Sequence, residues 1–282
     1  MTSGSGRPPF SVRFWGVRGT IPCPGAGTLR YGGNTPCVEV TCGEHRLVFD
    51  AGTGLRRLGQ TLLANGHTVT SHVFLTHTHL DHVNGLPFFR PAYDGRNRFE
   101  FWAGHLTPQR RRLDEVLGTL MQAPFFPVPF DIMHACIAFH DFQAGDELTP
   151  LGDVRIKTAA LRHPGGATGY RVEFDSRAFA YITDTEHDGD RLDENILGLI
   201  DGADLVVYDA TYTEAEMETH RGWGHSSWQH GLRLMEEAAA DRFVAFHHDP
   251  DHDDQRLDAI ASEMAGRRDR AMMAVEGEVI EL

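Results

Sequence analysis

The sequence predicts a protein of the α/β class, in which two β-sheets pack together and helices cover the outside. Short apolar runs typical of strands occur early, for example at residues 47–49 and 73–75. Helical spacing of apolar residues, as at residues 55–63, is interspersed with further strands in both halves. No repeat or low-complexity linker divides the chain. We therefore expect one domain over residues 10–282, preceded by a flexible tail at residues 1–9.

The remaining elements follow from the same patterns. Pro108 suits the first turn of a helix, whereas the three prolines of residues 123–130 exclude a helix there. We expect a loop whose phenylalanines pack inward. A lid or a contact surface, and with it a homodimer, is the open alternative. Further strands are expected at residues 12–14, 38–40, 99–102, 154–161, 170–174, 178–183, 205–209 and 243–246, and helices at residues 108–121, 193–200, 226–240 and 254–264.

Composition points to a cytoplasmic protein. No apolar run approaches the roughly 20 residues that span a bilayer, and the first residues lack the apolar core of a signal peptide. The four cysteines form no C-x-x-C pair, which favours buried thiols in a reducing compartment. The net charge is −14, divided into +5 for residues 1–125 and −19 for residues 126–282. This negative net charge argues against nucleic-acid binding over a large part of the surface.

Histidine and aspartate are concentrated directly after the apolar strand at residues 73–75. His77, His79, Asp81 and His82 lie within six residues, and a core cannot bury so many imidazoles and a charge without partners. Coordination removes this difficulty, because neutral imidazole and carboxylate are ligands for zinc, manganese and iron. A loop at the strand end can direct His77 and His79 to one metal ion, and Asp81 and His82 to a second.

This H-x-H-x-D-H motif resembles the signature of the metallo-β-lactamase superfamily, and the resemblance implies a four-layer αββα sandwich. It also implies later ligands at strand ends, and three residues match. They are His163, Asp184 and His247, with His248 as a rival to His247. By this resemblance the first of two divalent ions, with zinc preferred and manganese or iron as alternatives, is held by His77, His79 and His163. The second is held by Asp81, His82 and His247, and Asp184 bridges them. Asp50 matches an aspartate that braces such sites.

The segments around Asp209 and His225 resemble those of the phosphodiesterase branch of the superfamily. This branch includes tRNA-maturing endonucleases and small cyclic-phosphate diesterases. There an acidic residue orients a histidine, which implies that Asp209 fixes His225 and that His225 protonates the leaving alkoxide. With Asp81, these are the residues assigned to catalysis. The alternative makes Ser226 a helix N-cap and His225 an ordinary loop residue. Residues 14–20 and 30–35 also resemble this branch, and either line the mouth of the site or pack the first hairpin.

The combined prediction is a dinuclear phosphodiesterase in which a metal-bridging hydroxide attacks a small phosphodiester, such as a cyclic nucleotide. The chain lacks the long basic arm of the tRNA-processing relatives. Together with the negative charge, this argues against a nucleic-acid polymer as substrate. The main alternative is an acyl hydrolase, such as a lactonase or thioesterase, which needs no Asp209–His225 pair. A diiron redox protein fits less well, because such relatives carry Glu where this chain has His79 and append a flavin domain. A scaffold with a vestigial site conflicts with the intact ligand set.

Overall fold

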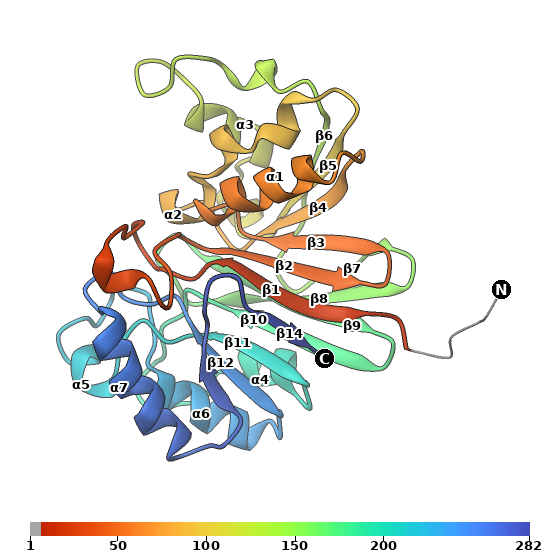
Figure 1. The fold of residues 1–282 in the computed structure, drawn as a ribbon. Coiled ribbons are helices and arrows are strands. Elements are labelled where there is room, and N and C mark those ends of the chain that lie inside the picture. The colour runs from red at the N-terminus through yellow and green to blue at the C-terminus, as the bar shows by residue number, and fades with distance from the viewer. Residues whose placement is uncertain (1–6) are drawn as a thin grey trace.

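Two seven-stranded sheets pack face to face in this computed structural model, which describes residues 7–282. Helices cover the outer face of each sheet (Figure 1). The predicted α/β class and αββα layering are therefore confirmed. The predicted flexible tail at residues 1–9 lies mostly outside the described residues. That tail and the single domain over residues 10–282 stay predictions.

The first sheet has the strand order β14-β1-β2-β3-β4-β5-β6. Its amino-terminal strands pair antiparallel, and β3 to β6 run parallel. The strand bounds are β1 Phe10–Gly16, β2 Cys37–Cys42, β3 His45–Phe49, β4 Thr70–Leu75, β5 Arg98–Ala103, β6 Cys136–Asp141 and β14 Val279–Glu281.

The second sheet has the order β13-β12-β11-β10-β9-β8-β7, and β10 to β13 run parallel. Because the carboxyl ends of parallel strands meet at one edge, the segments that follow β10, β11 and β12 lie together. The strand bounds are β7 Glu147–Leu151, β8 Val154–Leu161, β9 Ala167–Phe174, β10 Arg177–Ile182, β11 Leu205–Asp209, β12 Arg242–Phe246 and β13 Ala271–Met273.

The helices divide between the two outer faces. Helices α1 and α3 lie over the first sheet, and α4, α6 and α7 over the second (Figure 1). Helix α1 buries Leu55, Leu58 and Leu62, the side chains whose spacing predicted it. The helix bounds are α1 Gly54–Ala64, α2 Leu80–Val83, α3 Leu113–Leu120, α4 Glu194–Ile200, α5 Glu214–Met217, α6 Trp228–Glu237 and α7 Asp254–Ala265.

Several element predictions need correction. The helix expected at residues 108–121 is interrupted at Arg110, whose left-handed φ of 56° ends a short 3-10 turn before α3 begins. The helix expected at residues 226–240 starts later, because the Ser227 side chain accepts the N–H of His230 as an N-cap. In the loop at residues 123–130, Phe126 and Phe130 pack partly buried against the core as predicted, but Phe125 is 92% exposed.

Two other expectations can be compared with the structure. Within residues 7–282, no helix combines the length and apolarity that crossing a bilayer requires. All four cysteines are free thiols. Cys37 and Cys42 are buried as expected, whereas Cys136 is exposed.

Candidate metal centre

The predicted ligands come together at the carboxyl ends of strands from both sheets. β4 leads into the loop of His77 and His79 and into α2, which carries Asp81 and His82. The other strands contribute single residues, which are His163 after β8, Asp184 after β10 and His247 after β12. We call these seven residues the His–Asp cluster.

Three residues at equivalent strand ends have a left-handed backbone. Asp50, Asp184 and His247 have φ values of 62°, 59° and 64°. Such a conformation costs a non-glycine residue on the order of 1–3 kcal/mol and is concentrated at functional sites. Here it turns each side chain from the strand end towards the gap between the sheets.

Asp184 lies at the centre of the cluster and divides it into two halves. Its Oδ1 lies 3.8 Å from His77 Nε2 and 3.7 Å from His163 Nε2. His163 Nε2 in turn lies 3.1 Å from His79 Nδ1. Three imidazole nitrogens therefore converge on one side of the Asp184 carboxylate.

The other carboxylate oxygen faces the second half. Asp184 Oδ2 lies 3.3 Å from His82 Nε2 and 3.4 Å from His247 Nε2. Asp81 Oδ2 is 3.3 Å from each of the same two nitrogens. The structure therefore brings the seven predicted residues together as two groups of donors, joined through the two oxygens of one carboxylate.

The donor set fits divalent cations. Nε2 of His77 and Nε2 of His82 are buried without a hydrogen-bond partner among the described residues, which is costly unless a cation or water occupies the gap. Burial would raise the pKa of the Asp184 carboxyl, but His247, His82 and His77 lower it well below its usual range. Burial lowers the pKa of His77 well below its ordinary value, so this imidazole is neutral and can coordinate.

The non-coordinating ring nitrogens are held by a second set of contacts, as is usual for metal-binding histidines. Asp50 is fully buried and accepts the Nδ1–H of His82 at 2.9 Å. The same carboxylate accepts the backbone N–H of Thr76 at 2.8 Å and the hydroxyl of Tyr181 at 3.0 Å. Asp50 thus occupies the bracing position that the resemblance implied.

His248 is directed away from the cluster. Its Nε2 lies 2.8 Å from the carbonyl of Ala274, and its ring packs edge-on against Tyr31. Burial lowers the pKa of His248 to about 3. His247, by contrast, directs Nε2 at Asp81 and Asp184.

Asp209 and His225 form the predicted contact beside the cluster. Asp209 Oδ2 lies 3.1 Å from His225 Nδ1. Burial opposes protonation of His225, but the charge and hydrogen bond of Asp209 outweigh it and raise the pKa of the imidazole to about 9. Asp209 also accepts the N–H of Thr185 and the hydroxyl of Thr211, which itself contacts His247 Nδ1 at 3.0 Å. The sequence did not indicate these links to the metal ligands.

The segment at residues 17–20 lies against the second half of the cluster, a role left open by the sequence. Arg18 is fully buried and donates to the carbonyls of Gly32, Asp249 and His252. These hydrogen bonds fix the position of the segment, in which the Thr20 N–H donates to Asp81 Oδ2 at 2.9 Å. In the other early motif, at residues 30–35, Tyr31 and Thr35 are buried, whereas Arg30 is exposed.

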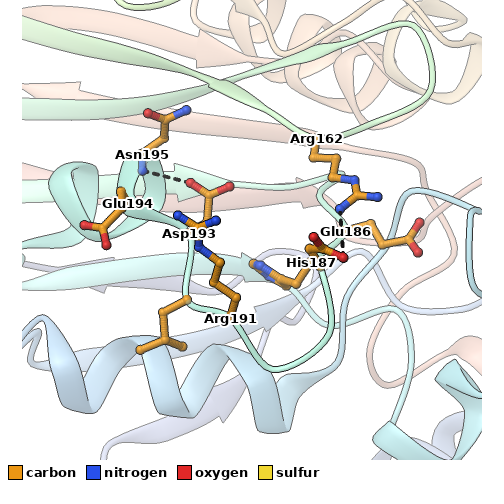
Figure 2. Close-up of a pocket in the computed structure, with 9 residues that line it drawn as sticks. Arg162, Glu186, His187, Arg191, Asp193, Glu194 and Asn195 are labelled. Carbon is orange, nitrogen blue, oxygen red and sulfur yellow. Dashed lines mark hydrogen bonds and ion pairs between the residues drawn. The ribbon is translucent and has the colours of Figure 1, made fainter.

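Two cavities adjoin the cluster. One of about 160 Å³ is lined by His77, His79 and His105 among others. A larger one of about 620 Å³ reaches His225 and continues along His187 and His230. A second pocket, which shares Arg162, Glu186 and His187 with the larger cavity, is shown in Figure 2.

The family model of the beta-lactamase superfamily domain matches residues 45–248, and the chain belongs to this superfamily. Ribonuclease Z of Haloarcula marismortui is 24% identical over an alignment that covers 95% of this chain and 93% of that protein. Among solved structures, the metallo-beta-lactamase fold protein YhfI of Bacillus subtilis has a TM-score of 0.72 at 18% identity, covering 98% of this chain and 100% of that one. Human tRNase Z, short form, has a TM-score of 0.67 at 19% identity, covering 96% of this chain and 98% of that one.

These comparisons confirm the predicted superfamily and its phosphodiesterase branch, and the chain is a metal-dependent hydrolase. They also correct one expectation. The exclusion of a nucleic-acid polymer as substrate was wrong, because relatives aligned over most of the chain are named ribonucleases. The net charge of −14 misled the prediction, since it is summed over the whole surface. The sign of the potential where a substrate meets two cations is a local property.

Proposed function

We propose that this protein is a phosphodiesterase that acts with two divalent cations and uses the Asp209–His225 pair to assist the leaving group. Membership of the superfamily and the ribonuclease Z relatives support the reaction class. The leaving-group role rests on the 3.1 Å contact between Asp209 Oδ2 and His225 Nδ1. The same His225 nitrogen lies 3.8 Å from Oδ1 of the central Asp184 carboxylate. An acyl hydrolase needs no such pair.

The His–Asp cluster would hold the cations, with His77, His79 and His163 around one ion and Asp81, His82 and His247 around the other. Asp184 would contact both ions. Zinc suits this set of imidazole and carboxylate donors, and manganese and iron are the alternatives. When bound, such a pair supplies a nucleophilic hydroxide at neutral pH and offsets charge on a phosphoryl oxygen.

His225 would act as the general acid. Because Nδ1 faces Asp209, Nε2 is the nitrogen left to deliver a proton. As the bond between phosphorus and the leaving oxygen breaks, the proton of Nε2 passes to that oxygen, and the alcohol departs neutral. Asp209 keeps the imidazole protonated at neutral pH, because it raises the pKa of His225 to about 9. Bound cations nearby would lower that pKa towards neutrality.

A small phosphodiester, such as a cyclic nucleotide, is the substrate class we propose. The cavity of about 620 Å³ beside His225 lies within the range of small-molecule sites, roughly 300–1,000 Å³. An RNA strand that places one phosphodiester at the cluster is the second candidate, favoured by the names of the relatives. Cytoplasmic location and a homodimer stay predictions.

The proposal is tested with metal-reconstituted protein on 2′,3′-cyclic nucleotides, bis(p-nitrophenyl) phosphate, an RNA with a 3′ extension and a lactone. We expect His225→Ala to lower kcat on the cyclic nucleotide by about 10²–10⁴-fold, since the alkoxide leaves poorly without an acid. Hydrolysis of bis(p-nitrophenyl) phosphate should be largely spared. His220→Ala, on the same segment, is the matched control. Faster turnover of the lactone than of every diester would favour the acyl hydrolase instead.

A further inference from the structure

A short glycine-rich segment, residues 222–224, connects the first half of the His–Asp cluster to the leaving-group histidine. Gly224 immediately precedes His225, and its carbonyl accepts the Nδ1–H of His163 at 2.8 Å. A Cβ on Gly224 would lie 2.4 Å from His163 Nδ1, and Gly224 has a left-handed φ of 86°. Both the close approach and the backbone conformation require glycine. The position of this one peptide therefore sets the ring orientation of His163 and the starting point of His225.

Glu186 fastens that segment through both of its carboxylate oxygens. Oε1 accepts the backbone N–H of Gly222 at 2.7 Å, and Oε2 accepts the N–H of Gly224 at 2.8 Å. Hydrogen bonds from N–H groups to an ionised carboxylate are stronger than those between neutral groups. Without Glu186, neither N–H has another acceptor among the described residues, and a turn rich in glycine loses its main restraint.

The backbone of Glu186 is itself held in the site. Its N–H donates to the carbonyl of Arg162 at 2.8 Å, next to His163. Two residues earlier in the chain is Asp184, the central carboxylate, and Thr185 between them donates its N–H to Asp209. Figure 2 shows Glu186 on this loop, opposite Arg162. Glu186 thus joins the strand-end turn that carries Asp184 to the turn that carries His225.

We infer that Glu186 is a positioning residue that acts through the 222–224 segment to hold the metal ligand His163 and the leaving-group acid His225 in their working geometry. This inference rests on the proposed function for the role of His225, and only on the metal-binding fold for the role of His163. Glu186 belongs to none of the ligand groups of the cluster, and both of its carboxylate oxygens are engaged by the 222–224 segment. Replacing Glu186 should therefore displace His163 and His225.

The experiment compares Glu186→Ala and Glu186→Gln with wild type. Glu236→Gln is the control, because Glu236 is exposed on α6, lines neither cavity of the site and has no side-chain hydrogen bond or ion pair within residues 7–282. The first readout is the zinc affinity of the apoprotein, measured with a competing chelator. We expect Glu186→Ala to weaken binding of one zinc ion of two by about 10-fold or more, the range found when partners of metal-binding histidines are removed.

The second readout is the dependence on the leaving group. Thymidine 5′-(p-nitrophenyl) phosphate needs little protonation of its leaving group, whereas the phenyl analogue needs more. We expect Glu186→Ala to lower kcat on the phenyl diester by about tenfold more than on the p-nitrophenyl diester, because a displaced acid helps only the poorer leaving group. Glu186→Gln retains one acceptor and should lie between wild type and Ala. If Glu186→Ala does not fold, Glu186→Gln takes its place in both measurements.

The outcomes separate the inference from the proposed function. If wild type cleaves neither diester, the proposed function fails, and the zinc titration alone judges the link to His163. Equal losses on both diesters with unchanged zinc affinity, in variants that keep their melting temperature, would overturn the positioning role. So would a Glu236→Gln variant with the same two effects.

Discussion

Replacing Asp50 with Asn tests whether a buried hydrogen bond sets the coordinating nitrogen of His82. Asp50 accepts from the Thr76 N–H with Oδ1, and from His82 Nδ1 and the Tyr181 hydroxyl with Oδ2, all without exposure to solvent. In the variant, the amide oxygen stays on the Thr76 N–H, for which residues 7–282 offer no other acceptor. The amide NH2 then faces His82, and its donor favours an imidazole protonated on Nε2. That proton occupies the position where the cation should bind.

The expected magnitude follows from these contacts. Removing the carboxylate partner of a metal-binding histidine lowers metal affinity by about 10–100-fold, or about 1.4–2.7 kcal/mol. The Tyr181 hydroxyl also loses its acceptor, which adds about 1–3 kcal/mol of destabilisation unless it rotates to accept from the amide. We therefore expect Asp50→Asn to bind one zinc ion as wild type does and the second at least tenfold more weakly.

The assay is zinc content after equilibration against a chelator, with urea unfolding as the measure of stability. Tyr181→Phe is the matched control, because it removes another hydrogen-bond donor to the same oxygen and leaves the contact to His82 intact. It should keep both zinc ions. If Asp50→Asn retains two zinc ions at unchanged affinity, the tautomer of His82 does not depend on Asp50, and the reasoning is refuted.

Three further perturbations follow from the site. In Asp209→Asn, the pKa of His225 should fall from its raised value of about 9. Since the acid must be protonated to work, the alkaline limb of kcat against pH should move to lower pH at saturating zinc, and an unmoved limb would contradict the assignment. Gly19→Ala places a Cβ 2.4 Å from His247 Nδ1, so the zinc content should fall towards one ion, and a full complement would show that the loop can yield. Arg18→Met leaves the buried carbonyls of Gly32 and His252 without their donor, whereas that of Asp249 keeps the N–H of His252. Urea titration should show a loss on the order of 3 kcal/mol; a loss below about 1 kcal/mol would mean that water replaces the guanidinium.

The sequence indicated much of the fold because local patterns and burial agree there. Strands β8 and β11 begin and end where alternating or continuous apolar residues predicted. The prediction of elements failed where the backbone conformation does not follow the spacing of apolar residues. Arg110 interrupts a helix through a left-handed conformation that no side-chain periodicity signals. The short edge strands β13 and β14 carry too few residues to show a period.

The sequence alone determined which chemical groups are available. The dense run from His77 to His82 indicated a metal site, and the superfamily resemblance of this run then nominated His163, Asp184 and His247 after later strands. Only the tertiary structure decided how they are used. It set His247 against the cluster and His248 away from it, since adjacent residues of one chain point in different directions. It also showed Glu186, Arg18 and Asp209 acting through backbone amides and carbonyls. Such contacts depend on where distant peptides meet and therefore leave no motif in the order of residues.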